Sequence, residues 1–430
     1  MKLAEFKNMV QRGELKGKLA HMYCCGTDEV GKYEDRLLAC ADRFSETFTA
    51  EDDREIIVVS APGRTEIGGN HTDHQRGKVL TGSVNVDALC FISRNGTETA
   101  NVFSEGYGML SVDVSDTEIR EADFNTTSAL VRGVCSGLSQ EGYVISGFDA
   151  YIVSDVPGGS GLSSSACFEV LIGFALNALY CGNEVDAVKI ARIGQFAENK
   201  YFGKPSGLMD QMGCAVGGVV AIDFADADDP KYRHIDFDFA KAGYTLCIID
   251  SGADHADLTD DYSAMPREMK EVASFLGADV LSQADEERFW ASIPEIRKAC
   301  GDRAVLRAYH YFEDCRRVDR EVDALSEGDF RRFLETVRDS GRSSFMYLQN
   351  ISTYRDPADQ PVAIALAAAE KALHGESAVR VHGGGFAGTI QAFVPAGSVD
   401  EFRRNVDRVL GQGACKVMNI RPVGGTVIAG

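Results

Sequence analysis

The spacing of hydrophobic and polar positions divides the chain into helical stretches and short apolar runs. Amphipathic spacing predicts helices over residues 3–49, interrupted around residues 26–31. A β-branched run begins at Ile56 and ends at the Ala-Pro-Gly of residues 61–63. The dipeptide Asn-Gly at residues 95–96 is typical of a hairpin turn, so we expect one there. Further strand patterns occur at residues 88–93, 109–114 and 148–153.

The second half of the chain is richer in helix. From about residue 254 to 348 the pattern is almost entirely helical. The remaining expected elements are helices at 164–180, 184–201, 362–373 and 399–410, and strands at 218–224, 244–249, 389–394 and 416–420. We therefore expect an α+β protein of two domains, residues 1–228 and 229–430, divided in an acidic stretch.

The charge balance and the cysteines limit the partners and the compartment. A net charge of −21 over 430 residues argues against a nucleic-acid or anionic-membrane partner. The 12 cysteines show no CxxC spacing, which is typical of a reducing cytosol. No signal-peptide pattern is present, and the most apolar run, residues 166–180, is too short to span a bilayer. We therefore expect a cytoplasmic protein without nucleic-acid or membrane partners, and the oligomeric state stays open.

Residues 156–167 read Val-Pro-Gly-Gly-Ser-Gly-Leu-Ser-Ser-Ser-Ala-Cys and are the most informative segment. Glycines let the backbone approach a ligand closely, and the helix that follows presents free N–H groups at its positive end. Such a turn is a ready site for phosphate, although the Gly-Lys-Ser/Thr of the common P-loop is absent. A flexible loop before a serine-capped helix explains the segment equally well on its own. The candidate nucleotide-binding residues are Pro157, Gly158, Gly159, Ser160, Gly161, Leu162, Ser163, Ser164 and Ser165.

Residues 61–74 gather polar side chains that suit a sugar or polyol. Arg64, Asn70, His71, Asp73 and His74 lie within eleven positions of a glycine-containing loop. Carboxylates, amides and imidazoles on such a loop donate to and accept from specific hydroxyls. Two other interpretations stay open: a metal site formed by His71, Asp73 and His74, and a polar surface turn.

Two carboxylates and a second glycine cluster complete the candidates. Asp210 stands in Gly-Leu-Met-Asp-Gln, among apolar residues where an unpaired carboxylate is costly. The residues alone leave it as a general base, a metal ligand, an ion-pair partner or a helix N-cap. Glu198 is by itself a solvated carboxylate, but close to a triphosphate it becomes a candidate ligand of Mg²⁺. Four glycines within residues 383–388 again indicate close backbone approach.

Together these segments resemble the GHMP small-molecule kinases, and within them the galactokinases. The early galactokinase motif Pro-Gly-Arg-Val-Asn-Leu-Ile-Gly-Glu-His-Thr-Asp-Tyr is followed in register by residues 62–74. The phosphate-loop motif Gly-Leu-Ser-Ser-Ser-Ala is identical to residues 161–166. Gly-Ile-Met-Asp-Gln matches residues 207–211 except at Leu208, and Gly-Gly-Gly-Phe-Gly-Gly matches residues 383–388 except at Ala387. The order and spacing agree over about residues 50–425.

The resemblance implies a fold, a reaction and a set of site residues. The fold would be a two-domain GHMP kinase fold, with an N-terminal domain like part of ribosomal protein S5 and a ferredoxin-like C-terminal domain. The reaction would be ATP-dependent phosphorylation of the anomeric hydroxyl of galactose in the cleft between them. The implied roles are Arg64 and Asp210 at the reacting hydroxyl, Asn70, His71, Asp73 and Tyr262 at the sugar, and Ser164 and Glu198 at Mg²⁺.

Three departures from the family motif concern the sugar. Asn70 replaces a Glu that is expected to bind the 6-hydroxyl, Glu66 replaces an Asn, and Gly68 replaces an Ile. The loss of a negative charge at residue 70 would spare galacturonate a like-charge repulsion, and galacturonate, N-acetylgalactosamine and arabinose stay open as alternative substrates. A non-catalytic sugar sensor is a second hypothesis, which the intact Arg64 and Asp210 oppose. A kinase of mevalonate or homoserine is a third, which the His-Thr-Asp sugar motif opposes.

Overall fold

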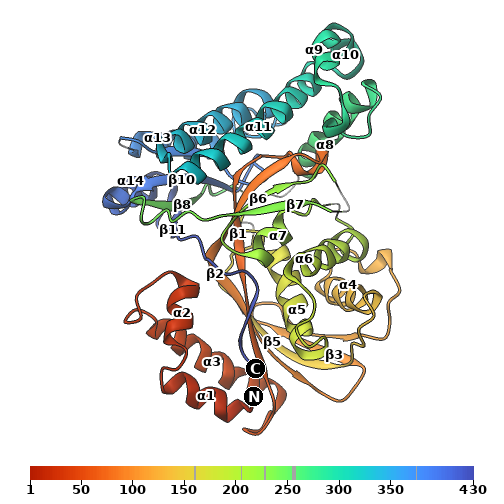
Figure 1. Cartoon of the computed structure of the whole chain (residues 1–430), viewed down its shortest axis with the longest axis vertical. Coiled ribbons are helices and arrows are strands. Elements are labelled where there is room, and N and C mark those ends of the chain that lie inside the picture. Colours follow the sequence, from red (N-terminus) through yellow and green to blue (C-terminus); the bar gives the residue numbers. More distant parts are fainter. Residues whose placement is uncertain (159–160, 205, 227–228, 254–257, 374) are drawn as a thin grey trace.

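The computed structural model describes residues 1–158, 161–204, 206–226, 229–253, 258–373 and 375–430, and its strands form two sheets (Figure 1). The larger sheet has eight strands. Its main path is β12 (Thr426–Ala429), β1 (Ile57–Gly68), β2 (Lys78–Arg94), β5 (Phe148–Ser154), β3 (Thr99–Ser104) and β4 (Gly108–Asp113), with β6 (Val219–Asp223) and β7 (Lys231–Ile235) continuing from β2. The antiparallel smaller sheet runs β11 (Cys415–Met418), β8 (Tyr244–Asp250), β10 (Thr389–Pro395) and β9 (Ala378–Val381). The expected α+β class is confirmed.

Helices cover both faces of the larger sheet. On one side lie α1 (Leu3–Gln11), α2 (Lys16–Tyr23) and α3 (Gly31–Phe48), as Figure 1 shows. On the other side lie α4 (Thr127–Gln140), α5 (Ser164–Tyr180), α6 (Ala187–Phe196) with its π-helical continuation Ala197–Phe202, and α7 (Met209–Val216). The predicted bounds of α5 agree with the structure at both ends.

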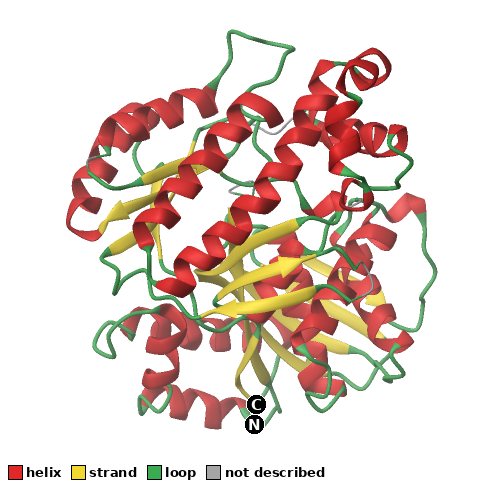
Figure 2. Cartoon of the chain, turned by 45° about the horizontal axis from the view of Figure 1, so that its top comes forward, coloured by secondary structure: helices red, strands yellow, loops and turns green. Residues whose placement is uncertain are grey.

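The smaller sheet is also sandwiched between helices (Figure 2). Phe333 of α12 (Phe330–Ser343) shares a buried cluster with Leu246 and Phe393, on one face. Val362 of α13 (Pro361–Ala372) and Phe402 of α14 (Val399–Leu410) pack on the other face. The other helices of this half are α8 (Thr259–Phe275), α9 (Glu286–Ala291), α10 (Ile293–Cys300) and α11 (Asp302–Glu327).

The N-terminal helices are a cover for one face of the larger sheet. Phe6 and Phe44 are fully buried and share a cluster with Val58, Phe91 and Tyr151 of the strands. Their strand neighbours, such as Val59 and Ile92, belong to the cluster on the opposite face, as the alternation of side chains along a strand requires. Helices α1, α2 and α3 therefore shield from water an apolar sheet face that would otherwise be exposed.

Strand β1 is longer than the sequence predicted. It continues through Pro62 to Gly68, so the polar motif begins on the strand and becomes a loop only at Gly69. Proline cannot donate to a sheet, and the pairing with β2 shifts register between Pro62 and Arg64 and again between Glu66 and Gly68. These irregularities let the strand continue past Pro62 and Gly63 as far as Gly68.

The predicted hairpin at residues 95–96 is wrong. β2 and β3 are consecutive in sequence but are not paired, because β5 lies between them. β5 runs antiparallel to β2 and parallel to β3. The Asn-Gly signal reports a tight local turn, whereas strand pairing depends on contacts with a segment more than 50 residues later in the chain.

The larger sheet takes strands from both sides of the predicted domain boundary. β7 and β12 both follow residue 228 but pair with β6 and β1. The two termini consequently lie at the same end of the molecule (Figures 1 and 2). Within the described residues, no helix combines the length and the apolar character that crossing a membrane requires.

Candidate functional site

The phosphate loop connects β5 to α5 and is hydrogen-bonded to β1. Gly161 and Ser163 have positive φ values of 70° and 58°, and the fully buried Leu162 lies between them. The Leu162 carbonyl accepts a hydrogen bond of 3.1 Å from the Arg64 N–H. A Cβ on Gly161 would lie 2.5 Å from Thr389 Oγ1, so this glycine lets the loop approach β10. The predicted residues Gly159 and Ser160 lie outside the described residues.

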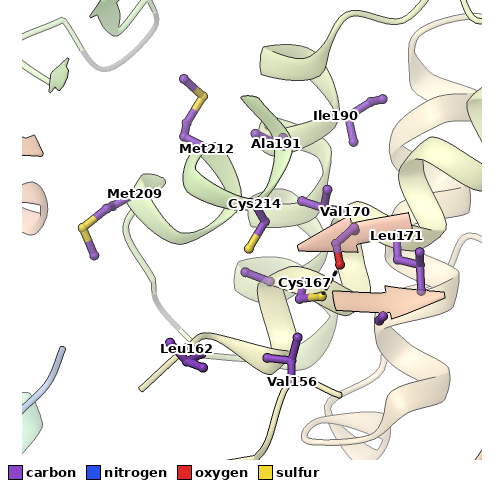
Figure 3. Packing of buried hydrophobic residues seen from close by; sticks show 14 of the residues in the cluster. Val156, Leu162, Cys167, Val170, Leu171, Ile190, Ala191, Met209, Met212 and Cys214 are labelled. Atoms are coloured by element: carbon purple, nitrogen blue, oxygen red, sulfur yellow. Dashed lines mark hydrogen bonds between the residues drawn. The ribbon is translucent and has the colours of Figure 1, made fainter. Parts of the chain in front are cut away.

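The apolar core beneath the loop fixes the start of α5 against α7 (Figure 3). Leu162, Cys167 and Val170 from the loop and α5 belong to the same buried cluster as Met212 and Cys214 of α7. The Cys167 thiol donates to the Ala61 carbonyl at 3.2 Å, which ties α5 to β1 as well. Because close packing leaves little room for movement, the first residues of α5 and α7 keep a fixed separation.

Arg64 and Asp210 form the central pair of the site. Arg64 Nε and Nη2 lie 2.8 and 2.7 Å from Asp210 Oδ1, and Nη1 donates to the Gly161 carbonyl. Ser163 Oγ donates to Asp210 Oδ2 at 2.5 Å. The Arg64 side chain is 7% exposed and that of Asp210 is 30% exposed, so the carboxylate is the accessible member. The pair thus joins the sugar motif, the phosphate loop and α7 at one point.

The electrostatic environment keeps Asp210 ionised. Burial raises its pKa, but Arg64, the Ser163 hydrogen bond and the more distant Lys204 together lower the pKa below its usual value. A carboxylate held in this way accepts hydrogen bonds well but is a weak base in the ground state.

His71 and Asp73 lie on the loop after β1, and the Asp73 carboxyl is close enough to Arg64 and Asp210 to interact with their charges. His71 Nε2 is 3.1 Å from the Gly384 carbonyl, which can only accept, so Nε2 carries the proton. Burial lowers the pKa of His71 to about 4, so the ring is neutral and its Nδ1 is an acceptor. A Cβ on Gly207 would lie 1.9 Å from Asp73 Oδ2, so this glycine admits the carboxylate. Burial raises the pKa of Asp73 to about 6, and nearby Asp210 adds to the shift.

Asn70, predicted to contact the sugar, instead points into the protein. Its Nδ2 donates to Glu66 Oε1 and to the Gly383 carbonyl, both at 2.8 Å. Its Oδ1 accepts from Ser344 Oγ at 3.1 Å and from Asn350 Nδ2 at 2.9 Å. The side chain is fully buried, and these contacts use its two donors and its acceptor lone pairs. In this conformation no hydrogen-bonding capacity of Asn70 is left for a hydroxyl.

The other two departures from the motif belong to the same buried layer. Glu66 accepts from Arg380 Nη2 at 2.8 Å, and both side chains are almost completely buried. Burial raises the pKa of Glu66 to about 7, against the effect of Arg380. A Cβ at Gly68 would lie 1.9 Å from Glu321 Oε2, so the missing isoleucine makes room for a buried carboxyl from α11. Glu66 and Asn70 are thus in direct hydrogen-bond contact, and Gly68 makes room for a further buried carboxyl nearby.

The late glycine segment, residues 383–388, lies against the loop after β1 that carries His71. Tyr262 of α8 donates from its hydroxyl to the Gly385 carbonyl at 2.8 Å, and its ring packs edge-on against Phe386. A Cβ on Gly384 would lie 2.5 Å from the Tyr262 ring. The structure therefore brings Tyr262 to the glycine segment that also accepts from His71.

Glu198 lies on the π-helical turn, behind the start of α5. Its carboxylate accepts from Ser165 at 3.3 Å, Ser206 at 2.6 Å and Gln211 at 2.9 Å, and pairs with Lys204 at 2.9 Å. Its side chain is 3% exposed. A carboxylate beside serine hydroxyls is a set of hard oxygen donors, which suits Mg²⁺ when phosphate oxygens supply the remaining ligands.

A second metal hypothesis fails. Among the described residues, no group of three or more His, Cys, Asp or Glu side chains is placed to hold a metal ion. This contradicts the alternative of a metal site formed by His71, Asp73 and His74. Burial lowers the pKa of His74 to about 3, which fits a buried neutral ring.

Two residues of this region were not among the predicted site residues. His382 lies under the phosphate loop, with Nε2 3.0 Å from Thr65 Oγ1 and Nδ1 2.9 Å from Thr389 Oγ1. Lys204 pairs with Glu198. The only signal for Lys204 was a basic residue in the short segment between Glu198 and Gly207, a position that by itself is typical of a solvated helix end.

Comparisons with known proteins agree with this geometry. The GHMP kinases N terminal domain matches residues 129–218, and the galactokinase galactose-binding signature matches residues 42–94. The galactokinase of Streptomyces coelicolor is 31% identical over 373 residues, which cover 85% of this chain and 91% of that protein. The chain belongs to the galactokinase family. The predicted family membership is confirmed, and ATP use follows from it.

Further relatives extend the comparison. Within the galactokinase family, the enzyme of Lactobacillus helveticus is 26% identical over 360 residues, covering 82% of this chain and 89% of that protein. The crystal structure of Lactococcus lactis galactokinase complexed with galactose matches with a TM-score of 0.77 and 25% identity, over 91% of this chain and 99% of that one. The mevalonate kinase of L. major in complex with R-mevalonate has a TM-score of 0.58 at 13% identity, over 85% of this chain and 96% of that one, and shares the fold.

Proposed function

We propose that this protein transfers the γ-phosphoryl group of ATP to the anomeric hydroxyl of galactose, forming galactose 1-phosphate. The observation that carries the proposal is the Arg64–Asp210 pair, which joins β1 and α7 to the phosphate loop. Family membership and the similarity to a galactokinase complexed with galactose support galactose as the sugar.

Asp210 and Arg64 would act on the attacking hydroxyl. Phosphoryl transfer passes through a loose transition state, so positioning and charge stabilisation supply most of the catalysis. The accessible Asp210 carboxylate would accept the hydrogen bond of the anomeric hydroxyl and orient its oxygen. Because its pKa is lowered, it would take the proton late, after the P–O bond has begun to form. Arg64 would stabilise negative charge on the same oxygen.

The start of α5 would hold the polyphosphate. Its N–H groups and the positive end of the helix are suited to phosphate oxygens. Glu198 and the Ser164 hydroxyl would hold Mg²⁺, which neutralises charge on the transferring group when bound. Ser164 opens the helix, and Ser165 is already directed at Glu198.

The sugar would lie between the loop after β1 and the late glycine segment. The His71 Nδ1 acceptor, the Asp73 carboxylate and the Tyr262 side chain would contact its hydroxyls. Asn70 would act indirectly, because its hydrogen bonds hold β1 and the late glycine segment together.

We also propose the division into domains 1–228 and 229–430, with β7 and β12 paired in the larger sheet although they follow residue 228. A cytoplasmic location is proposed as well, since all 12 cysteines are free thiols.

Release of ADP from MgATP with single sugars tests this proposal. Galactose should support turnover, and Asp210→Asn should lower kcat by about 10³-fold or more, as for a group acting on the transition state. Asp238→Asn, at a surface carboxylate 48% exposed, is the matched control and should keep full activity. Turnover with galacturonate, N-acetylgalactosamine or arabinose but not with galactose would overturn the choice of sugar. Sugar-dependent ATP binding without turnover would favour a sensor.

A further inference from the structure

The phosphate loop of this chain brings no cation of its own. Residues 156–167 contain no lysine or arginine, although ATP carries several negative charges and the whole chain carries −21. Arg64, the nearest cation described at the loop, is engaged by Asp210 and by the Gly161 carbonyl. The N–H groups of a helix N-terminus can hold phosphate by themselves, and a side-chain cation adds a stronger, charge-assisted hydrogen bond. A side-chain cation for the phosphates would therefore have to come from elsewhere in the chain.

Lys204 has the placement that this role requires. It follows the π-helical turn through Gly203, whose φ is 81°, and its backbone N–H donates to the Glu198 carbonyl at 3.1 Å. Its Nζ lies 2.9 Å from Glu198 Oε1. The Lys204 side chain is 56% exposed, while that of Glu198 is 3% exposed. The ammonium thus lies on the open side of a buried carboxylate, one hydrogen bond from the first turn of α5 through Ser165.

The partners of Glu198 show why this lysine matters. Its other donors, Ser165, Ser206 and Gln211, are neutral. In the part of the chain that the structure describes, Lys204 is the one cation paired with this carboxylate. Glu169 adds a second buried carboxyl, joined to Glu198 through Gln211. The ammonium therefore engages one oxygen of the carboxylate that would hold Mg²⁺.

The geometry points to Lys204 as the mobile cation of the phosphate site. Without nucleotide it neutralises Glu198; when MgATP binds, it releases Glu198 to the metal and turns its ammonium to the polyphosphate. The four-carbon stem and the exposed ammonium allow the movement without a change in the backbone. This inference rests on the proposed kinase function, and it goes beyond it by naming a residue that contacts the nucleotide.

Two consequences separate this role from that of a structural ion pair. ATP without metal should bind measurably to the wild type, because the exposed Lys204 ammonium can leave Glu198 and contact the phosphates. In Lys204→Met that affinity should fall about tenfold or more, the effect of one charge-assisted hydrogen bond. Addition of Mg²⁺ should strengthen ATP binding more in Lys204→Met than in the wild type, because the metal no longer competes with the ammonium for Glu198.

The experiment is calorimetric titration of ATP in EDTA and in excess Mg²⁺, with wild type, Lys204→Met, Lys204→Arg and Lys200→Met. Lys200 is an exposed lysine on the π-helical turn that precedes Lys204, so Lys200→Met should match the wild type. Lys204→Arg keeps the charge and should recover most of the metal-free affinity, even if Lys204→Met folds poorly. Galactose affinity, measured separately, should be the same in all four proteins.

The outcomes distinguish this inference from the proposed function. Equal ATP affinity of Lys204→Met and the wild type under both conditions would overturn the role of Lys204. A loss of ATP affinity that Lys204→Arg does not recover, either in EDTA or in Mg²⁺, would also overturn the role of Lys204. Such a loss would indicate that the substitution disturbs the structure. ATP binding with the predicted Lys204 dependence but no sugar turnover would overturn the galactose reaction alone. A wild type that binds no ATP would overturn both.

Discussion

The substitution Asn70→Asp tests most sharply the buried polar layer that contains Glu66 and Asn70, next to the loop after β1. Asp has the shape of Asn, so the change creates no cavity and no overpacking. It replaces an amide that donates to Glu66 Oε1 and to the Gly383 carbonyl by a carboxylate that donates to neither. It also places two carboxylates about as close as the 2.8 Å that now separates Asn70 Nδ2 from Glu66 Oε1.

The structure sets the expected magnitude. A buried polar group left without its partner costs about 1–3 kcal/mol, and an uncompensated buried charge costs about 3–5 kcal/mol. Proton uptake relieves part of this, because burial already raises the pKa of Glu66 to about 7. We therefore expect Asn70→Asp to lower the free energy of unfolding by about 3 kcal/mol at pH 8, and by less at pH 6, where one proton is shared between the carboxyls.

Glu66→Gln in the same chain should recover part of the loss. The double variant exchanges the acid and the amide, so one donor again lies between residues 66 and 70. We expect a coupling energy of at least about 1 kcal/mol between the two sites, which are in direct contact. Urea unfolding followed by circular dichroism measures it, and Asn8→Asp at an exposed position of α1 is the control. A neutral Asn70→Asp, or strictly additive effects of the pair, would refute the reasoning.

Three further predictions concern the site and the N-terminal cover. Because burial raises the pKa of Asp73 to about 6, protonation below that pH should lower kcat/KM for galactose, and Asp73→Asn should remove this acid limb from the pH profile. Gly207→Ala would place a Cβ 1.9 Å from Asp73 Oδ2, so KM for galactose should rise about tenfold or more while ATP affinity stays unchanged in equilibrium titration. Phe44→Ala removes a fully buried ring between α3 and the sheet and should cost about 3–5 kcal/mol in urea unfolding, with kcat of the folded enzyme unchanged.

The stability of the protein between pH 4 and pH 6 should depend on the ionisation of Asp73. Its folded-state pKa lies above its usual value of 3.8, so the folded protein retains a proton that the unfolded chain has already lost. The contribution of this group is therefore present below pH 3.8 and is lost as the pH rises to about 6. Asp73→Asn should become more stable relative to the wild type across this window, which thermal unfolding at successive pH values measures.

Local patterns predicted those parts of the fold that local physics determines. The apolar run and its leading serines gave both ends of α5 correctly, because one buried helix begins and ends within it. The Asn-Gly turn at residues 95–96 was interpreted as a hairpin, yet β5 inserts between the flanking strands. Strand order depends on long-range contacts that no local pattern contains. The length of β1 was underestimated for the same reason, since its later residues are held by β2.

In the candidate site, too, some features could be predicted from the sequence and others depend on contacts between distant segments. Motif positions predicted that Arg64 and Asp210 meet, and their separation of 146 residues in sequence is bridged by a 2.8 Å hydrogen bond. The direction of the Asn70 side chain was not predictable, because it depends on Ser344 and Asn350 from distant helices and loops. Lys204 was missed because a lysine after a helix is usually solvated, and only the buried position of Glu198 shows its importance.

The proposed reaction is tested by locating the phosphate on the sugar product. The protein is incubated with MgATP and galactose, and the product is analysed by proton–phosphorus correlation NMR, with Asp210→Asn in parallel. The account predicts that phosphorus couples to the anomeric proton of galactose in the wild-type product, and that Asp210→Asn gives none in the same time. A phosphate on the 6-hydroxyl, or equal product from Asp210→Asn, would contradict it.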